Sequence, residues 1–266
     1  MNNLDRSLEI FADGEKIDAF GRACLSGKEK LGLFPMPWML RLWNLSEENF
    51  LRLSRAKEVS VSQEGLVLAA GTIADVFRRL TLEGTVTHVC FSLNLSLWNA
   101  QVSFSVEAGT TVSETVRRLL EASGTGIQLL SFPGEDRVLT RGQAFFGRTA
   151  ECVEEALSAV GARGYMVPAG LCVVPAEGVP VSVRLTEEDL LNAPSAAAGG
   201  LIVLRTGTVG WSVGKGISVS WDNQQASGVI LERAVEADTQ SGLWQAELLI
   251  SIHSFAIAVT KVPVEL

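Results

Sequence analysis

The chain is 266 residues long, with 47% hydrophobic residues, 20% charged residues and a formal net charge of −8. A chain of this length and hydrophobicity can bury a core without disulfide bonds, so it is expected to form one large domain or two to three small ones. The acidic balance argues against a protein whose main task is to bind nucleic acid, because phosphate contacts need clustered Lys and Arg.

Residues 1–105 alternate between apolar and polar side chains in the manner of β-strands. The alternation is clearest in five segments, at residues 38–45, 58–62, 65–70, 86–97 and 101–106. Gly71 follows the third segment and is expected to mark a bulge or a tight bend. We therefore predict that residues 1–105 form an antiparallel β-barrel.

Residues 106–180 contain a duplicated unit. A shift of 37 positions aligns residues 109–129 with residues 146–166, so that Glu114 matches Glu151 and Gly124 matches Gly161. Such self-similarity is typical of a repeated supersecondary unit. Each copy predicts one short helix that ends at its glycine and continues into an extended segment.

The two predicted helices cover about residues 111–123 and 149–160, and Thr111 and Glu114 match a capping box at the start of the first. Each helix carries an apolar stripe, formed by Val112, Val116, Leu119 and Leu120 in the first copy and by Val153, Ala156, Leu157 and Val160 in the second. Because helices this short are unstable alone, we expect the stripes to pack together. The polar faces should meet solvent or, alternatively, a neighbouring subunit; they carry Arg117, Arg118, Glu154 and Glu155.

After a predicted strand pair at residues 164–174, built around a Pro-Ala-Gly turn, the strand alternation returns in residues 181–266. Residues 185–191 predict a single capped turn of helix, and residues 195–200 a flexible joint. Strands are expected at residues 201–205, 217–221, 229–235, 243–252 and 255–263. Such a series of short strands with turn residues between them predicts a second antiparallel barrel, in whose core Trp244 should lie.

One segment matches a catalytic motif. Residues 210–214, GWSVG, fit the GxSxG pattern of a nucleophile elbow around Ser212, and the acids and the base of a triad follow in the hydrolase order, as Asp222, Asp238 and His253. An elbow needs a helix directly after the serine, whereas the residues after Gly214 alternate like a strand. We therefore interpret the segment as a tight glycine turn and keep a hydrolase as the less favoured alternative.

No metal or cofactor site is predicted. The two histidines lack Cys or acidic partners at ligand spacing; His88 lies in the polar phase of its strand and His253 is expected in a loop. Dinucleotide and P-loop patterns are absent. The acids Glu187–Asp189 fit the start of a helix. The cysteines lack CxxC spacing and are expected to be reduced and mostly buried, at Cys24, Cys90, Cys152 and Cys172. Neither a secretory signal nor a membrane span is expected.

The order of these elements resembles the baseplate hub proteins of contractile and related phage tails, including those of bacteriocin particles and injection machines. The resemblance covers nearly the whole chain; it is strong from about residue 105 to 252 and loose before that. It is closest in the last region, in a pattern that comprises Val213, Gly214, Gly216, Val219, Trp221, Gly228, Asp238, Thr239, Gly242, Trp244 and Leu248.

The resemblance implies a mainly β fold in which two tube-type antiparallel β-barrels, residues 1–105 and 181–266, flank the duplicated αβ region of residues 106–180. It implies a structural protein without catalytic, metal-binding or cofactor-binding residues. Such a hub is a homotrimer, whose six barrels match a hexameric tail tube on one side and whose other end narrows to a three-fold spike.

The partners implied are further copies of the chain, the tail tube protein and the spike protein, with tape-measure, sheath and wedge proteins as further candidates. The location implied is a phage tail baseplate or a tailocin particle that assembles in the bacterial cytoplasm. A rival interpretation takes the repeat as a pair of LysM-like modules that bind peptidoglycan. Such modules usually hang on flexible linkers, which this repeat lacks.

Overall fold

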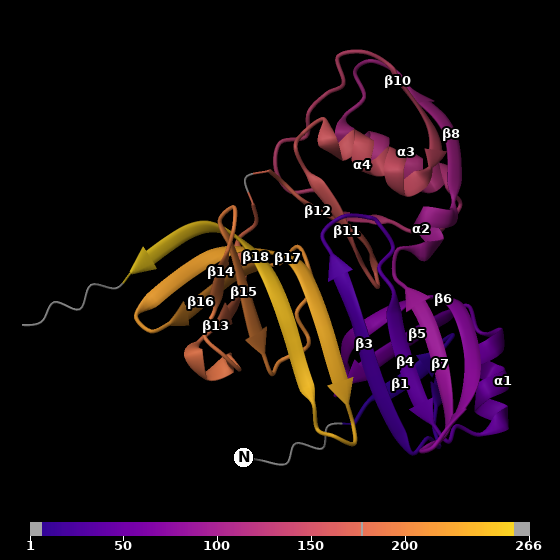
Figure 1. Cartoon of the computed structure of the whole chain (residues 1–266). Helices are drawn as coiled ribbons and strands as arrows, with labels where there is room; N and C mark the ends of the chain where they lie inside the picture. The colour runs from indigo at the N-terminus through magenta and orange to yellow at the C-terminus, as the bar shows by residue number, and fades with distance from the viewer. Residues whose placement is uncertain (1–6, 177, 258–266) are drawn as a thin grey trace, which may run out of the picture.

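The structure is a computed structural model that describes residues 7–176 and 178–257. Two β-sheet regions lie side by side, and a smaller αβ unit projects from them (Figure 1). The expected fold class, mainly β with a small α+β insert, is confirmed.

The first region comprises β1 (Glu9–Ala12), β2 (Glu15–Ile17), β3 (Arg22–Lys30), β4 (Trp38–Trp43), α1 (Glu47–Arg55), β5 (Glu58–Gln63), β6 (Leu66–Thr81) and β7 (Gly84–Ser92). Gly71 lies inside β6, where an added Cβ would sit 2.3 Å from the carbonyl carbon of Ser92. Its role is therefore to permit a close approach of two backbones. The register irregularities of β6 lie on either side of it, between Val67 and Ala69 in the pairing with β5 and between Ile73 and Asp75 in the pairing with β7.

The αβ unit comprises α2 (Leu95–Asn99), β8 (Gln101–Val106), α3 (Val112–Ala122), β9 (Leu129–Ser131), β10 (Gln143–Arg148), α4 (Thr149–Ser158), β11 (Arg163–Val167) and β12 (Gly170–Val174). The prediction of one strand over residues 86–97 is wrong at its end, because Leu95 begins a helix. Leu97 is fully buried in the core of the αβ unit, and a short apolar run fits helix and strand equally well. β8 pairs with β10 and so belongs to this unit.

The two predicted helices lie next to each other (Figure 1), and their stripes share one buried cluster that includes Val116, Leu120, Val153 and Leu157. The predicted packing is confirmed. The Thr111 side chain accepts a hydrogen bond from the Glu114 amide at 3.2 Å, which is one half of a capping box. The Glu114 carboxylate instead pairs with Arg118 at 2.8 Å and with Arg117 at 3.5 Å.

The second region comprises β13 (Val181–Leu185), η1 (Glu187–Asp189), β14 (Ser195–Ala197), β15 (Leu201–Thr206), β16 (Gly216–Trp221), β17 (Gln224–Asp238) and β18 (Trp244–Ile257). The expected capped turn is present as η1, where Thr186 and Asp189 form a capping box. Trp244 is 4% exposed, so its predicted place in the core is confirmed.

Three expectations for this region are corrected. Residues 195–200 form the hairpin of β14 and β15, in which Gly199 and Gly200 supply positive φ, and are not a joint. β18 runs without a break through His253, which therefore lies in a strand and not in a loop. β13 pairs with β16 in parallel, so this region is not purely antiparallel. The end of the predicted last strand, residues 258–263, lies outside the described residues.

Within the described residues, thirteen strands form one continuous sheet. In the first region the strands are ordered β1-β5-β6-β7-β4-β3, and in the second β13-β16-β17-β18-β15-β14. If β2 is left out and the six strands of each region are numbered along the chain, both orders read 1-4-5-6-3-2. The two regions therefore share one strand order, and they differ in the direction of the first strand, because β1 runs antiparallel to β5 whereas β13 runs parallel to β16. A single apolar cluster runs through both and includes Leu25, Phe91, Ile217 and Trp244.

Candidate functional site: the seam between the two sheet regions

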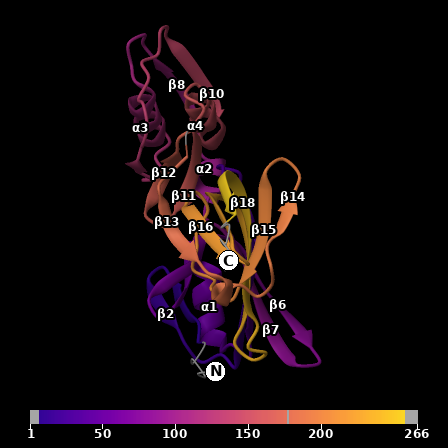
Figure 2. The same ribbon diagram turned by 90° about the vertical axis from the view of Figure 1, so that its left-hand side faces the viewer.

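The two regions are joined by direct strand pairing. Seven residues of β3, Cys24–Lys30, pair antiparallel with seven residues of β17, Asp238–Glu232. β17 can serve both regions because its first part pairs with β16, and a register irregularity between Ile230 and Glu232 precedes the part that pairs with β3. Figure 2 shows the strands of the second region lying directly above and beside those of the first. We call this β3–β17 pairing the seam.

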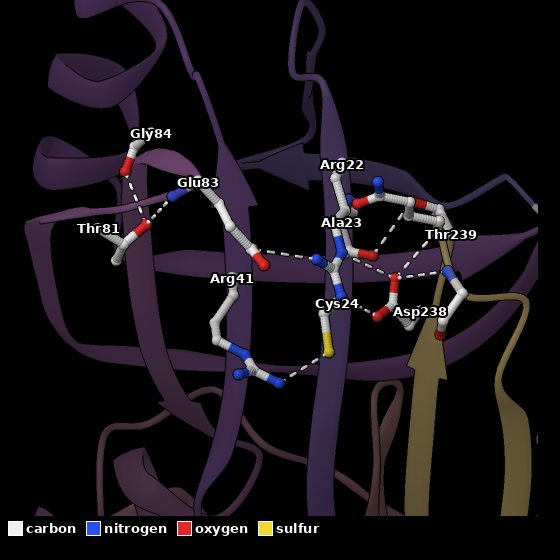
Figure 3. Close-up of polar contacts among 11 residues, drawn as sticks. Arg22, Ala23, Cys24, Arg41, Thr81, Glu83, Gly84, Asp238 and Thr239 are labelled. Carbon is white, nitrogen blue, oxygen red and sulfur yellow. Dashed lines mark hydrogen bonds and ion pairs between the residues drawn. The ribbon is translucent and has the colours of Figure 1, made fainter.

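An ion pair closes one end of the seam. The Arg22 guanidinium donates two hydrogen bonds to the Asp238 carboxylate, one of them from Nε to Oδ1 at 3.0 Å (Figure 3). It also donates to the Glu83 carboxylate at 3.3 Å. Hydrogen bonding from Arg22 holds the pKa of Asp238 well below its usual range, helped by the amides of Gln240 and Ser241. Thr239 continues the pairing, since its hydroxyl accepts from the Ala23 amide at 3.0 Å.

A second pair lies in the interior beneath the seam. Arg233 is 3% exposed and meets Glu29, its partner in the strand register, at 2.9 Å. Its guanidinium also donates to the backbone carbonyls of Leu68 at 2.8 Å and Val209 at 3.1 Å. Burial raises the pKa of the Glu29 carboxyl, and Arg233 opposes that rise. One buried cation thus holds together β3, β6 and the loop before β16.

The sheet face opposite the core is lined with polar and aromatic side chains in rows that cross the strands. One row follows the register directly and consists of Phe77, His88, Arg41, Cys24 and Asp238. Phe77 and His88 stack with ring centroids 4.8 Å apart, and burial lowers the pKa of His88. Arg41 donates to the Cys24 sulfur at 2.9 Å, while burial raises the pKa of that thiol (Figure 3).

The αβ unit is anchored to the first region. The backbone amide of Leu33, in the loop between β3 and β4, donates to the Glu154 carboxylate of α4 at 2.6 Å. The Leu33 side chain is fully buried in the core of the αβ unit. Glu154 is exposed, as expected, but its carboxylate is also engaged within the chain. Glu155 accepts from Gln143 at 2.8 Å.

The hydrolase motif does not form a catalytic arrangement. Ser212 lies in an irregular loop that leads into β16, so no helix follows it. Among the described residues no hydrogen bond joins Ser212 to Asp222, Asp238 or His253, and Asp238 is engaged by Arg22. The His253 ring lies beside Gly178, where an added Cβ would sit 3.1 Å from His253 Nε2. The interpretation as a glycine turn agrees with Gly214, which has a φ of +77°.

The remaining chemical expectations concern metals, thiols and membranes. Cys24 and Cys152 are buried, Cys90 and Cys172 are half-buried, and all four are free thiols. The part of the chain that the structure describes contains no His, Cys, Asp or Glu cluster suited to a metal ion. In that same part, no helix is long and apolar enough to cross a membrane.

The residues of the seam were not found from the sequence. Arg233 and Asp238 lie in a strand that was predicted only in part, and their partners Glu29 and Arg22 lie about two hundred residues away along the chain. The one available signal was that Arg233 shares the strand phase of the apolar residues Val235 and Ala237. A buried arginine needs a partner, but the sequence does not say which of the chain's acids supplies it.

Comparison with known proteins identifies the fold. No family model matches the chain, and no curated protein matches it in sequence. Among solved structures it resembles a tail protein of Neisseria meningitidis MC58, with a TM-score of 0.69, 10% identity and coverage of 91% of this chain and 95% of that one. It likewise resembles the 43 kDa tail protein of prophage MuSo2 from Shewanella oneidensis, with a TM-score of 0.65, 10% identity and coverage of 92% and 96%.

A third similar structure comes from a secretion machine. It is the Escherichia coli c3393 protein, a component of the type VI secretion system that is described as similar to the bacteriophage T4 tail proteins gp27 and gp5. The TM-score is 0.66 at 11% identity, over 92% of this chain and 77% of that one. The chain thus has the fold of phage tail and baseplate-type proteins, and the predicted hub-like architecture is confirmed at the level of the fold.

Proposed function

We propose that the protein is a structural hub of a tail or injection machine, a homotrimer that joins a hexameric tube to a three-fold spike and forms part of the central conduit. The observation that carries this proposal is the seam. One chain contains the same strand order twice, and the two regions are fused edge to edge through seven residue pairs. Three such chains provide six equivalent units, which is the number that a match between six-fold and three-fold symmetry requires.

The charge pattern supports a conduit. The chain has a net charge of −8, and the non-core face of the sheet mixes cations and anions instead of forming a basic track. A surface that let DNA or protein pass should not bind phosphate tightly, and tight binding needs clustered Lys and Arg. The partners we propose are copies of the chain, a tube protein and a spike protein, in a tail or tailocin baseplate assembled in the bacterial cytoplasm.

The proposal is tested by mass photometry and negative-stain electron microscopy of the purified chain. We expect trimers, seen end-on as rings with a central opening. A dimer, or a monomer that persists at high micromolar concentration, would contradict the proposal. Addition of a cognate tube protein should produce a capped tube end, whereas a chain that binds along the tube wall would have another role.

Two alternatives make different predictions. The LysM interpretation is disfavoured because the αβ unit is packed onto the first region through Leu33 and Glu154 and is not suspended on a linker. A pull-down with purified peptidoglycan should therefore leave the protein in solution. The hydrolase alternative predicts labelling of Ser212 by a fluorophosphonate probe. We expect no labelling, and we expect Ser212→Ala to leave oligomeric state unchanged.

A further inference from the structure

The seam provides an internal pattern for how two copies of this topology join. In the second region, the long strand β17 has a register irregularity between Ile230 and Glu232. From Glu232 to Ala237 it is paired on both edges, with β18 on one side and with β3 on the other. In this segment the side chains that face the core are buried, so that Val235 is 3% exposed and Ala237 is 0% exposed.

The corresponding strand of the first region, β6, has the same irregularity between Ile73 and Asp75. From Asp75 to Thr81 it pairs with β7 on one edge, and within the described residues no strand pairs with the other edge. Leu80, at the position of Ala237, is 86% exposed. β6 therefore lacks the neighbour that its counterpart has. The Arg78 side chain in this segment is engaged by Ser46 and Glu47 at the start of α1, but no strand in the described part of the chain pairs with the backbone edge. An edge of this length without a strand partner is a template for another strand.

The strand β14, at the far end of the sheet, also has one edge without a strand partner among the described residues. β14 holds the position that β3 holds in the first region: it pairs with β15 on one edge and, in the part of the chain described, with no strand on the other. All three of its residues, Ser195–Ala197, are exposed. β3 and β14 are thus equivalent edge strands, of which the first is used within the chain and the second is not.

The pairing registers fix which residues correspond. In the first region one row across the sheet consists of Ser26, Met39, Cys90 and Asp75. In the second region the same row consists of Ser195, Val203, Leu249 and Glu232. Ser195 therefore corresponds to Ser26, and Asp75 corresponds to Glu232. In the seam Ser26 lies opposite Glu236, which is four residues after Glu232. The corresponding residue of β6, four residues after Asp75, is Arg79.

The two vacant edges cannot meet within one chain. The sheet order β14-β15-β18-β17-β3-β4-β7-β6 places five strands and the seam between β15 and β6. With neighbouring strands roughly 4.8 Å apart, β14 and β6 are separated by on the order of 30 Å along the sheet. Figure 1 likewise shows β14 in the left half of the molecule and β6 in the right half. A pairing of β14 with β6 is therefore possible only between two copies of the chain.

We propose that β14 of one copy pairs antiparallel with the second half of β6 of a second copy, with Ser195 opposite Arg79, Ala196 opposite Arg78 and Ala197 opposite Phe77. The pairing repeats the geometry of the seam between chains. It also sets small side chains against large ones, as the seam sets Gly27 opposite Val235. This inference rests on the proposed hub function, because a head-to-tail contact of this kind forms a closed ring only when the rotation between copies closes.

The register is tested with paired cysteines in the full-length chain. Arg79→Cys combined with Ser195→Cys places two thiols directly opposite each other across the interface, within reach of a disulfide. The matched control is Arg79→Cys with Ala196→Cys, which shifts one thiol to the other face of β14. The wild type and both single variants, oxidised in the same way, give the background from the four native cysteines.

We expect the first pair to give covalent trimers on a non-reducing gel, several-fold above the control pair and lost on reduction. Equal cross-linking in both pairs would overturn the register. If mass photometry finds trimers but neither pair cross-links, the edge pairing is wrong while the hub function stands. If the first pair cross-links into open chains of increasing length, the pairing is right and the trimeric hub is wrong. Monomers without cross-links would contradict both.

A surface variant tests the same edge without cysteines. Leu80→Asp changes an exposed residue that the proposed pairing covers, so the fold should be unaffected and the trimer should dissociate at a several-fold higher concentration. The control is Phe146→Asp on β10 of the αβ unit, because Phe146 is 87% exposed in the same chain. If both variants form trimers like the wild type, with unchanged melting temperature, β6 is not an interface.

Discussion

The two sheet regions share a strand order but differ in how they end. In the first, the edge strand β3 has nine residues and seven of them pair with β17, whereas in the second the equivalent strand β14 has three residues and pairs only with its own hairpin partner among the described strands. The first region also has the helix α1 where the second has the irregular loop around Gly210–Gly214. The two regions thus share a strand order, while their edges, their connections and the direction of their first strand differ.

The largest expected effect tests whether the two regions unfold together. Trp38 in the first region is 1% exposed and Trp244 in the second is 4% exposed, and both belong to one apolar cluster. Trp38→Ala and Trp244→Ala should each lower the free energy of unfolding by about 3–5 kcal/mol. Because the cluster is shared, denaturant titration should show one transition in each variant. Two separate transitions, or a loss below about 1 kcal/mol, would mean that the regions are independent or the residues are not core.

The second effect tests the buried ion pair that links the regions. Arg233→Met leaves the Glu29 carboxylate without its partner in the interior and should cost about 3–5 kcal/mol in unfolding free energy. Adding Glu29→Gln should recover much of this loss, because it removes the unpaired charge. The control is Arg205→Met, whose side chain is 56% exposed in its pair with Glu247 and which should cost at most about 1 kcal/mol. Equal losses at the two arginines would contradict the special role of Arg233.

The third effect is a pH dependence at the end of the seam. Arg22 lowers the pKa of Asp238 below its usual value of 3.8. A lowered pKa in the folded state adds stability above the unfolded pKa, and this stability is lost as the pH falls below that value. Asp238→Asn should therefore cost about 1.5–3 kcal/mol at pH 7, with a smaller difference from wild type at pH 3. Urea midpoints at both pH values measure this.

A matched variant at Glu83 distinguishes the contribution of the Arg22–Asp238 pair from that of an exposed ion pair of the same arginine. Glu83 also pairs with Arg22 but is 67% exposed. Glu83→Gln should change the urea midpoint little at either pH, because exposed ion pairs contribute at most about 1 kcal/mol. A pH response like that of Asp238→Asn would show that the effect comes from general surface charge.

The smallest effect concerns the anchoring of the αβ unit. Glu154→Ala removes the acceptor of the Leu33 amide and should cost about 1 kcal/mol, with faster hydrogen exchange at that amide. Glu155→Ala is the control, because Glu155 is next to Glu154 on the same helix and its carboxylate accepts from Gln143 and not from Leu33. Unchanged exchange at Leu33 in the Glu154 variant would mean that the hydrogen bond does not hold the loop.

Periodicity in the sequence predicted the elements whose environment is local. The helical stripes around Val116 and Val153 and the alternation from Trp244 to Ile250 were correct because one face of each element is buried. The segment around Leu97 was misassigned because five residues carry too little periodic signal to separate α2 from a strand. His253 was placed in a loop because neighbouring polar residues interrupt the pattern, although β18 continues through them on its exposed side.

The contacts of the seam could not be predicted from the sequence, for a different reason. Its partners, such as Arg22 with Asp238 and Glu29 with Arg233, are brought together only by the final fold. Hydrophobic pattern specifies which face of a strand is buried but not which strand lies beside it. The family resemblance supplied the expectation of two β regions around an αβ unit, and the pairing that joins these regions came only from the structure.

The antiparallel register of β3 and β17 has a mechanical consequence. Hydrogen bonds between antiparallel strands lie perpendicular to the strand axes. Tension applied along β17 would therefore load the bonds of all seven residue pairs at once, in shear, and would not open them one after another. The junction between the two halves of the chain is for this reason much stiffer to pulling along the strands than to peeling from either end.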